Sequence, residues 1–318
     1  MTDFDVAVIG GGAAGLSAAL VLTRARRDVL VVDSGVPRNA PAAQMQGFLS
    51  RDGFSPAELL ELGRNEVSSY GGQVVDAAVA DVEKTAMGFQ LVLDSGLSVS
   101  SRRLLVATGL RDELPEIPGL RERWARDVLH CPYCHGFEVR DSALGVLGWA
   151  PVAAHYAQIV RQWSDDVVYL DSNGTLDATE REELDARSIT IVGGIVERVL
   201  VQDDRLRGVE LDDGRAVELD ALFVPPRFIP NNDLLLDLGC KSDDNGWVVT
   251  DGTGRTSVAG VWVAGNVANP RAQVITAAGE GSAAAIALNA DLVSEDIRNA
   301  KSAPVRRRGS SGERGKRS

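Results

Sequence analysis

Apolar residues form short, uninterrupted runs that alternate with segments of helical spacing. The first run, residues 5–9, meets a glycine-rich turn, and residues 16–22 then place leucine and alanine at helical spacing. A second run, residues 28–33, ends in an acid. Continuous apolar runs of this length are typical of strands buried on both faces, so the chain is expected to begin with a strand–helix–strand unit.

The same hydrophobic pattern predicts the remaining elements of the first unit. They are a helix (56–70), three short strands (72–99) with a turn at 94–96, a strand (103–109), a late strand (260–267) and an alanine-rich helix (273–290). A second unit repeats the pattern between them. Its elements are a strand (142–148), a helix with proline in its first turn (151–163), a strand (166–171) and a strand pair (189–201 and 206–211).

The order of these elements predicts an α/β fold with two Rossmann-like, three-layer dinucleotide-binding domains. The first domain is discontinuous, because the chain leaves it and returns near residues 231–233. The expected divisions are the first domain in two parts (1–113 and 233–297), the second domain (114–232) and a disordered basic tail (298–318).

Composition narrows the class of protein. With 318 residues, 44% of them hydrophobic and 25% charged, the chain is long enough for two domains with sizeable cores. Its 3 cysteines are too few for a secreted disulfide scaffold, and no apolar run approaches the roughly 18 residues of a membrane span. We therefore expect a cytoplasmic protein without a membrane partner. The net charge of -12 argues against nucleic acid, although the tail from Lys301 is basic.

Three glycines between the first strand and helix have separate reasons to be there. Gly10 permits a tight turn, Gly12 lets the backbone approach a pyrophosphate, and Gly15 lets the helix pack on the strand. Together with the strand, the helix and the acid that follow, they predict a bound dinucleotide.

The start of this helix and the end of the next strand complete the predicted site. Ala13 and Ala14 open the helix, whose positive end stabilises phosphate. Asp33 ends the second strand and can bind both ribose hydroxyls of an adenosine.

The segment Cys131-Pro132-Tyr133-Cys134-His135 is the strongest candidate for chemistry. Two thiols at this spacing can close and reopen a disulfide, and a helix start or a nearby imidazolium lowers a cysteine pKa. His130 and His135 flank the pair. Three other interpretations stay open: a haem-attachment motif, although the N-terminus has no signal-peptide pattern, a zinc half-site with both histidines, and two inert thiols.

Four motifs together resemble the thioredoxin-reductase branch of the flavoproteins with two dinucleotide domains. They are the early G-x-G-x-x-G, the Ala107-Thr108-Gly109 crossover, the CxxC that opens the second domain and the late Gly260-Val261-Trp262-Val263-Ala264-Gly265-Asn266. The resemblance covers roughly residues 4–297 and implies a thioredoxin-reductase-like fold, FAD as cofactor, no metal and a homodimer.

The resemblance also assigns residues to the cofactor. In the family the position of Asn266 is an aspartate that binds the ribityl chain, and an asparagine can still hydrogen-bond a hydroxyl. The helix that starts near Gln273 and Val274 would stabilise negative charge on reduced flavin. Contacts are further implied for the loop after the second strand, for which an ordinary polar loop is the alternative, and for two glycine turns: Ser34, Arg38, Asn39, Thr108, Gly109 and Gly265.

The second unit departs from the family at the nicotinamide site. Its loop reads Gly148-Trp149-Ala150-Pro151-Val152-Ala153, so a Cβ, an indole and a proline stand where backbone N–H groups would hold a pyrophosphate. Asp171 would repel the 2'-phosphate of NADPH. We expect a scaffold domain with an empty pocket, and at most weak use of NADH.

The motif CPYCHGFE, with His135 after the CxxC, resembles the dithiol oxidases of gliotoxin- and holomycin-type pathways. The resemblance implies that a small dithiol attacks Cys131, that the reduced pair passes electrons through Cys134 to FAD, and that oxygen reoxidises the flavin. His135 would exchange protons with the thiols, while packing and catalysis are equally plausible for His130. A reductase using NADH, NADPH or ferredoxin, and a redox switch without turnover, remain alternatives.

Overall fold

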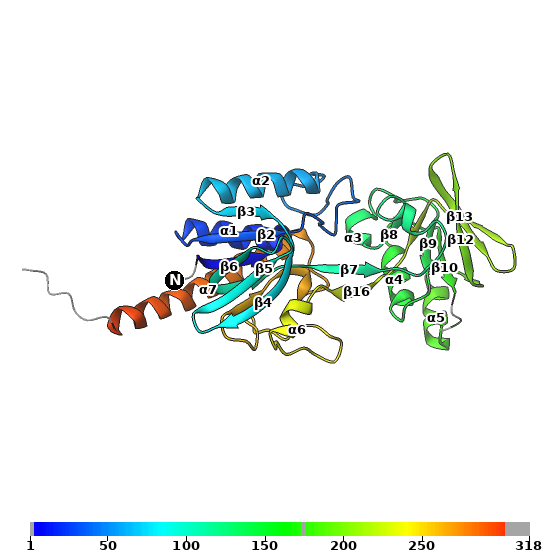
Figure 1. Ribbon diagram of the computed structural model, residues 1–318. Coiled ribbons are helices and arrows are strands. Elements are labelled where there is room, and N and C mark those ends of the chain that lie inside the picture. The colour runs from blue at the N-terminus through cyan, green and yellow to red at the C-terminus, as the bar shows by residue number, and fades with distance from the viewer. Residues whose placement is uncertain (1–2, 173, 175, 303–318) are drawn as a thin grey trace, which may run out of the picture.

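The computed structural model describes residues 3–172, 174 and 176–302, and it places them in two bodies joined by two strands (Figure 1). The connecting strands, β7 (Leu110–Glu113) and β16 (Arg227–Pro230), pair antiparallel. The hydroxyl of Thr108 donates to the carbonyl of Asn231 at 2.6 Å. The side-chain amide of Asn231 donates to the carbonyl of Thr108 at 3.0 Å. The chain thus leaves and re-enters the first body at one place, where these hydrogen bonds join the two connecting segments.

The first body is built on a seven-stranded sheet. The strand order is β3-β2-β1-β6-β5-β4, and β17 pairs with the C-terminal end of β6. The strands are β1 (Phe4–Ile9), β2 (Val29–Asp33), β3 (Gln73–Asp76), β4 (Val79–Thr85), β5 (Gly88–Leu93), β6 (Ser98–Val106) and β17 (Val261–Val263). The helices are α1 (Ala13–Arg24), α2 (Pro56–Ser69), α6 (Asp233–Asp237) and α7 (Val274–Ser302), with the 3-10 turn η2 (Gly265–Val267).

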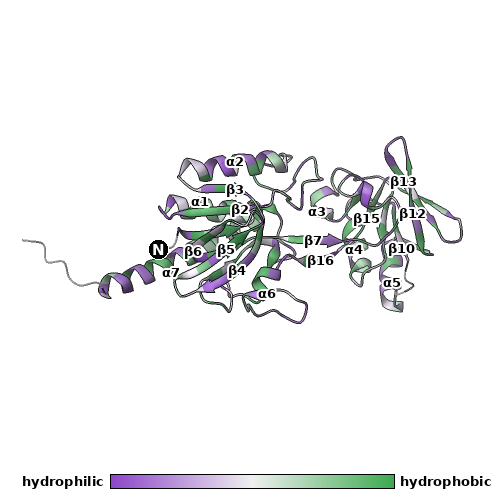
Figure 2. Cartoon of the chain, viewed as in Figure 1, coloured by the Kyte–Doolittle hydropathy of each residue, from purple (hydrophilic) through white to green (hydrophobic). Residues whose placement is uncertain are grey.

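Alternation along β1 divides the core of this body. Val6 and Val8 pack with α1 and α7 on one face, whereas Ala7 and Ile9 face the layer that contains α6 and the β4–β5 hairpin. All four side chains are at most 4% exposed, which is why the strand reads as continuously apolar. Figure 2 shows the apolar colour concentrated in these central strands and the hydrophilic colour at the free end of α7.

The second body has a parallel five-stranded sheet in the order β11-β10-β9-β15-β8. Helices α4 and α5 cover one face, and the small antiparallel sheet β12-β13-β14 covers the other. The strands are β8 (Val128–Leu129), β9 (Leu144–Leu147), β10 (Val167–Asp171), β11 (Thr190–Gly193), β12 (Val196–Gln202), β13 (Arg205–Leu211), β14 (Ala216–Glu218) and β15 (Ala221–Phe223). The helices are η1 (Arg121–Arg123), α3 (Pro132–His135), α4 (Ala153–Val160) and α5 (Ala178–Ala186).

The α/β prediction with a discontinuous first domain is confirmed, but several element boundaries were wrong. The helix predicted over 151–163 begins only at Ala153, because the Ala153 amide closes a turn onto the Ala150 carbonyl at 3.0 Å. The strand predicted over 189–201 is two strands in different sheets, since Gly194 turns the chain at φ +140°. The three short strands predicted over 72–99 are confirmed as β3, β4 and β5, and the predicted turn at 94–96 joins β5 to β6.

The last helix is longer than predicted. Instead of ending near Ala290, α7 continues to Ser302 and includes residues that we expected in the disordered tail. Arg102 and Arg103 of β6 form ion pairs with Glu295, and these hold the additional turns to the sheet. The rest of the predicted tail, residues 303–318, lies outside the described residues.

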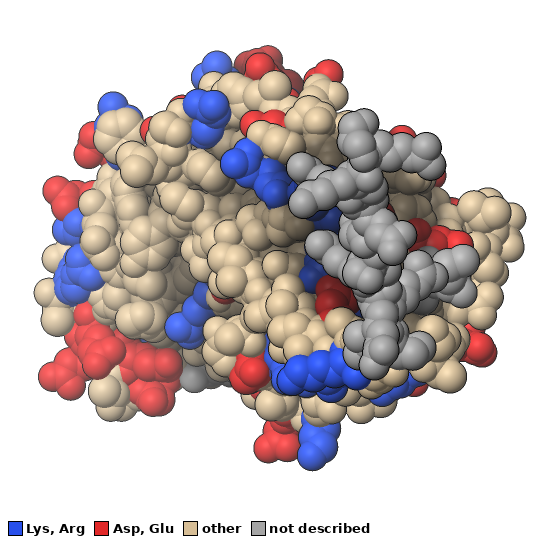
Figure 3. Space-filling model, turned by 90° about the vertical axis from the view of Figure 1, so that its left-hand side faces the viewer, with Lys and Arg blue, Asp and Glu red and all other residues tan. Residues whose placement is uncertain are grey.

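The surface carries both signs of charge. On the face in Figure 3, Lys and Arg side chains stand among acidic ones and do not join into a continuous basic surface outside the part covered by grey atoms. Within the described part of the chain, no helix is both long enough and apolar enough to cross a bilayer.

Candidate functional site

The loop between β1 and α1 has open space at only one of its glycines, Gly12. This is the glycine that the predicted pyrophosphate would approach. A Cβ on Gly10 would meet the Ala107 carbonyl oxygen at 2.4 Å, and one on Gly15 would meet the Gly10 carbonyl oxygen at 1.9 Å. A Cβ on Gly12 would meet nothing within 4 Å, and Gly12 begins α1 without a side-chain cap. The helix start therefore presents its N–H groups to an open cradle that fits a phosphate.

The acid at the end of β2 is held in place beside this cradle. The Gly11 amide donates to Oδ1 of Asp33 at 3.0 Å, and Arg64 of α2 forms an ion pair with Oδ2. The Asp33 side chain is 14% exposed. A carboxylate fixed in this way retains acceptor lone pairs for a ribose diol.

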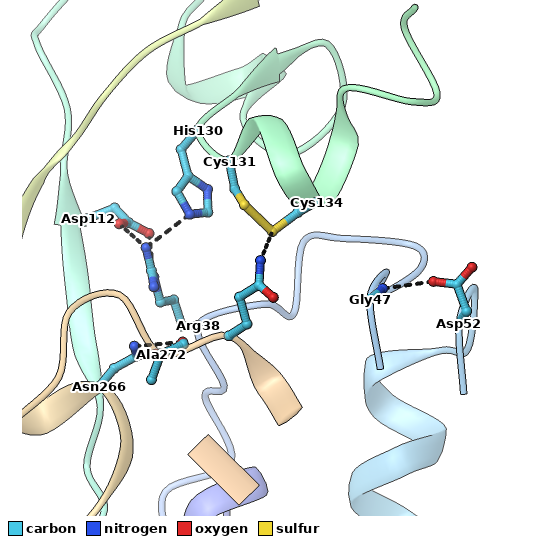
Figure 4. The surroundings of a disulfide bond; sticks show 10 residues. Arg38, Gly47, Asp52, Asp112, His130, Cys131, Cys134, Asn266 and Ala272 are labelled. Atoms are coloured by element: carbon cyan, nitrogen blue, oxygen red, sulfur yellow. Dashed lines mark hydrogen bonds and ion pairs between the residues drawn. A yellow bond between two sulfur atoms is a disulfide. The ribbon is translucent and has the colours of Figure 1, made fainter. Parts of the chain in front are cut away.

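The late loop closes the site from the other side. A Cβ on Gly265 would lie 3.0 Å from that of Ala14, so this turn rests on the first turn of α1. The Asn266 amide nitrogen donates to the carbonyls of Asn269 and Ala272, at 2.9 and 3.0 Å (Figure 4). Because both N–H groups are used in this way, Oδ1 is the end of Asn266 that can accept from a cofactor hydroxyl.

Cys131 and Cys134 form a disulfide at the start of α3, on the side of the second body that faces the first (Figure 1). Cys131 is the N-cap, and α3 has only 4 residues, so a helix dipole contributes little to thiol acidity. The Gln273 amide, immediately before α7, lies 4.0 Å from the sulfur of Cys134. Cys134 is therefore the sulfur next to the predicted cofactor site.

The two histidines beside the disulfide have different surroundings. Burial lowers the pKa of His135 below its ordinary value, and the carboxylate of Glu138 opposes this change. Burial, assisted by the Arg38 cation, lowers the pKa of His130 to about 4. His130 also stacks on Trp124 with ring centroids 5.8 Å apart. His135 thus keeps proton-exchange chemistry near neutrality more readily than His130.

Arg38 does not make the cofactor contact that we expected, because its guanidinium points elsewhere. Its guanidinium binds Asp112 of β7 through two hydrogen bonds of 2.9 and 2.7 Å, rather than pointing into the dinucleotide cradle (Figure 4). The other predicted cofactor residues lie in the loop after β2, between β6 and β7, and at the start of α7. Ser34 is exposed, Asn39 is half-buried, Gly109 turns at φ +71° and Val274 begins α7.

The corresponding loop of the second body has Ala150 at the position of Gly12, followed by Pro151, which has no backbone N–H. A Cβ on Gly148 would meet the Tyr169 hydroxyl at 2.5 Å, and the Trp149 indole donates to the Pro225 carbonyl at 2.8 Å. Asp171 is 7% exposed and pairs with Arg181 of α5 at 3.4 Å. Its Oδ1 atom has no hydrogen-bond partner among the described residues.

The cysteine pair also bears on the metal alternative. Both sulfurs are joined to each other, so neither is a metal ligand in this state. Over the described ranges, no group of three or more His, Cys, Asp and Glu side chains is arranged to hold a metal ion.

Sequence reasoning missed the residues that hold the site together. Asp112 and Phe228 lie on the two connecting strands and contact Arg38, while Arg64 holds Asp33. No local motif marks them. The signal for Asp112 and Phe228 was their position near the predicted domain crossings, whereas Arg64 lies within the helix predicted over 56–70.

Comparison with known proteins identifies the family. A model of the pyridine nucleotide-disulphide oxidoreductases matches residues 4–281. The chain belongs to this family. A thioredoxin reductase of Leptosphaeria maculans, sirT, is 31% identical over 313 residues, covering 92% of this chain and 96% of the relative. The crystal structure of HlmI superimposes with a TM-score of 0.91 at 55% identity, over 93% of this chain and 95% of that one.

A putative thioredoxin reductase from Bacillus anthracis, TrxB, gives a TM-score of 0.88 at 34% identity over 92% of this chain and 99% of that one. These similarities confirm the predicted thioredoxin-reductase-like fold and an oxidoreductase activity. Membership in this disulphide oxidoreductase family makes the chain a flavoprotein.

Proposed function

We propose that this disulfide oxidoreductase is an FAD-dependent dithiol oxidase that closes a disulfide in a small molecule and uses oxygen as electron acceptor. The observation that carries the proposal is the contrast between its two loops. The disulfide of the second body lies next to Gln273 of the first body, whose own loop is open at Gly12. The matching loop of the second body instead has Ala150 at the position of Gly12, followed by Pro151, which has no backbone N–H.

FAD fits the first body through groups already fixed by the protein. The N–H groups at the start of α1 would hold the pyrophosphate, Asp33 the adenosine ribose, and Oδ1 of Asn266 the ribityl chain. When bound, FAD supplies a two-electron acceptor that can reoxidise the reduced cysteine pair and be reoxidised by oxygen with release of peroxide.

Thiol exchange divides between the two sulfurs. A substrate thiolate attacks Cys131 and forms a mixed disulfide, with Cys134 as the leaving thiolate. The second substrate thiolate then attacks the substrate sulfur of that bond, which releases the cyclic disulfide and leaves Cys131 reduced. The substrate loses two electrons and two protons, and the cysteine pair gains both. The position of Cys134 beside Gln273 supports its role as the thiol that faces the cofactor.

His135 is proposed to carry the protons of these steps. It follows Cys134 directly, so its imidazole can accept a proton from a substrate thiol and return one to the leaving cysteine. Its lowered pKa leaves a neutral imidazole available at neutral pH. His130 is less suitable, since its Nε2 atom lies 3.3 Å from the Arg38 guanidinium.

Anaerobic titration of the yellow holoprotein tests the proposal. We expect a dithiol such as dithiothreitol to bleach the flavin and admission of oxygen to restore it, with peroxide released. Stopped-flow mixing with NADPH is expected to give no comparable reduction. Flavin reduction by NADPH at the dithiol rate would replace the oxidase with a reductase, and no rapid response to dithiol or nicotinamide would favour a redox switch.

One observation favours the reductase as a second candidate. Asp171 and Gly148 keep the spacing of Asp33 and Gly10, and the free Oδ1 of Asp171 could accept from the ribose of NADH. Reduction by NADH that disappears in Asp171→Ala would show that this second site is active.

The proposed assembly is a homodimer. Ile286, Val293 and Ile297 are 61%, 42% and 50% exposed, and their spacing places them on one side of α7. A second copy of the chain could cover this apolar face. Light scattering of the holoprotein should give twice the monomer mass, and a monomer at micromolar concentration would contradict the proposal.

A further inference from the structure

The guanidinium of Arg38 joins three segments that are distant in the sequence. Arg38 follows β2 in the first body and forms a two-bond ion pair with Asp112 of β7. Its charged carbon also lies 5.0 Å from the ring centre of Phe228 on β16, so it contacts both connecting strands. The Arg38 and Asp112 side chains are 22% and 9% exposed, and this partial burial protects the pair from solvent screening.

The same guanidinium reaches the residue before the disulfide. Its Nη2 atom lies 3.3 Å from Nε2 of His130 (Figure 4). Arginine has no acceptor, so Nε2 must accept the hydrogen bond with its lone pair. The imidazole is then neutral and carries its proton on Nδ1.

Aromatic contacts hold the imidazole in this orientation. Trp124 stacks on the ring of His130 with planes inclined by 27°, and Phe228 meets the ring edge-on at 6.3 Å. His130 is covalently followed by Cys131, so a fixed His130 also fixes the first cysteine. On the other side of the disulfide, Gln273 of the first body approaches Cys134. The disulfide therefore lies between two attachments to the first body.

We propose that Arg38 is a positioning residue for the thiol chemistry: bound to Asp112 and donating to Nε2 of His130, it locks His130 as a neutral Nδ1–H imidazole and holds the Cys131–Cys134 segment against the cofactor-binding body. This inference rests on the proposed dithiol oxidation. It assigns proton transfer to His135, because the His130 atom that faces Arg38 cannot act as a base.

The charges around His130 agree with this assignment. Burial is the main cause of its lowered pKa of about 4, Arg38 and His135 lower the pKa further, and Asp112 opposes them. Arg38 comes from the loop after β2, Asp112 from β7 and His135 from α3. Replacement of Arg38 would leave Asp112 as the dominant charged neighbour, so the His130 pKa should rise.

Nitrogen NMR of the holoprotein labelled with 15N-histidine reads the tautomer directly, since the chain has 3 histidines. We expect His130 to keep the Nδ1–H tautomer without titrating between about pH 5 and pH 8. In Arg38→Met, the pKa of His130 should rise from about 4, so that its titration moves to higher pH than in the wild type. Flavin reduction by dithiothreitol should also slow roughly 10-fold, because the disulfide loses its alignment, and its pH profile should gain an ionisation.

Two further variants complete the test. Arg24→Met is the matched control, since Arg24 packs on the Tyr70 ring at 4.8 Å elsewhere on the first body, and it should change neither reading. Asp112→Asn removes the anchor but retains the Arg38 charge, so it should slow flavin reduction while His130 stays neutral. It also serves if Arg38→Met does not fold.

Three results would overturn the inference. They are an Nε2–H tautomer of His130 in the wild type, titration of wild-type His130 near its ordinary pKa, or an unchanged rate of flavin reduction in both Arg38→Met and Asp112→Asn. A protein whose flavin no dithiol reduces would contradict the proposed function instead, and the NMR readings would still decide the role of Arg38 in fixing His130.

Discussion

The two bodies contain the same strand–loop–helix–strand arrangement, but their loops carry different residues at the helix start. In the first body, Gly12 faces empty space at the start of α1. In the second, Ala150 stands at the position of Gly12 and is followed by Pro151, which has no backbone N–H. A Rossmann-like strand order is therefore insufficient for dinucleotide binding, because the cradle depends on what the loop itself contains.

This difference divides the work between the bodies. The first retains a cofactor cradle, and the second supplies the disulfide and its two histidines. If the division is correct, substitutions in one body should remove one property of the enzyme and leave the other.

The largest effect is expected at the disulfide. Cys131→Ser and Cys134→Ser should each abolish dithiol turnover, because a single thiol cannot form the disulfide that accepts the two electrons. FAD content should stay at the wild-type level, since the thiols are separate from the cradle. Turnover assays with flavin absorbance measure both properties, and near wild-type dithiol oxidation in either variant would refute the proposed chemistry.

The next effect concerns the two loops themselves. Gly12→Val fills space that is empty in the protein alone, so it should leave the fold intact and lower the affinity for FAD by at least roughly 100-fold. Ala150→Val, at the matching position of the second loop, should leave FAD affinity unchanged. Equilibrium titration of the apoproteins with FAD provides the comparison. An unchanged affinity in Gly12→Val would place the cofactor elsewhere.

A smaller kinetic effect should separate the histidines of the second body. His135→Ala is expected to slow dithiol oxidation by roughly 100-fold near neutral pH, as is usual for a positioned acid or base. His155→Ala, an exposed histidine on α4, is the control. His130→Gln retains an acceptor for Arg38 and should lose less rate than His135→Ala.

The pH profile sharpens this assignment. A base must be neutral, so the rate should rise with pH through the pKa of His135. Glu138 favours the protonated imidazole, and Glu138→Gln should therefore lower that pKa and move the acidic limb to lower pH. An acidic limb that stays in place in Glu138→Gln and in His135→Ala would show that another group transfers the proton.

The sequence predicted the parts of the site that depend on local pattern. Gly10, Gly12 and Gly15 lie close together in the chain, and so do Cys131 and Cys134, so spacing alone indicates their geometry. Arg38, Asp112 and His130 meet only because the two connecting strands bring distant segments together, and no periodicity records such a contact. The length of α7 was missed for the same reason, since ion pairs with β6 extend it.

The smallest effects are expected from releasing the acid that ends the second strand of each unit. Asp33 pairs with Arg64, and Asp171 pairs with Arg181, but only Asp33 lies beside an open cradle. Arg64→Met should release Asp33 and weaken FAD binding by roughly fivefold, which is about 1 kcal/mol.

Arg181→Met should instead leave Asp171 as a buried carboxylate without its ion pair. Because Arg181 is half-exposed and the pair is long, we expect the free energy of unfolding to fall by only about 1 kcal/mol, with FAD affinity and dithiol turnover unchanged. Urea unfolding measures the stability of both variants, and FAD titration measures their affinity for the cofactor. Weaker FAD binding in Arg181→Met, or a change in dithiol turnover, would mean that the second loop takes part in the reaction and that the two bodies are less separate than their loops indicate.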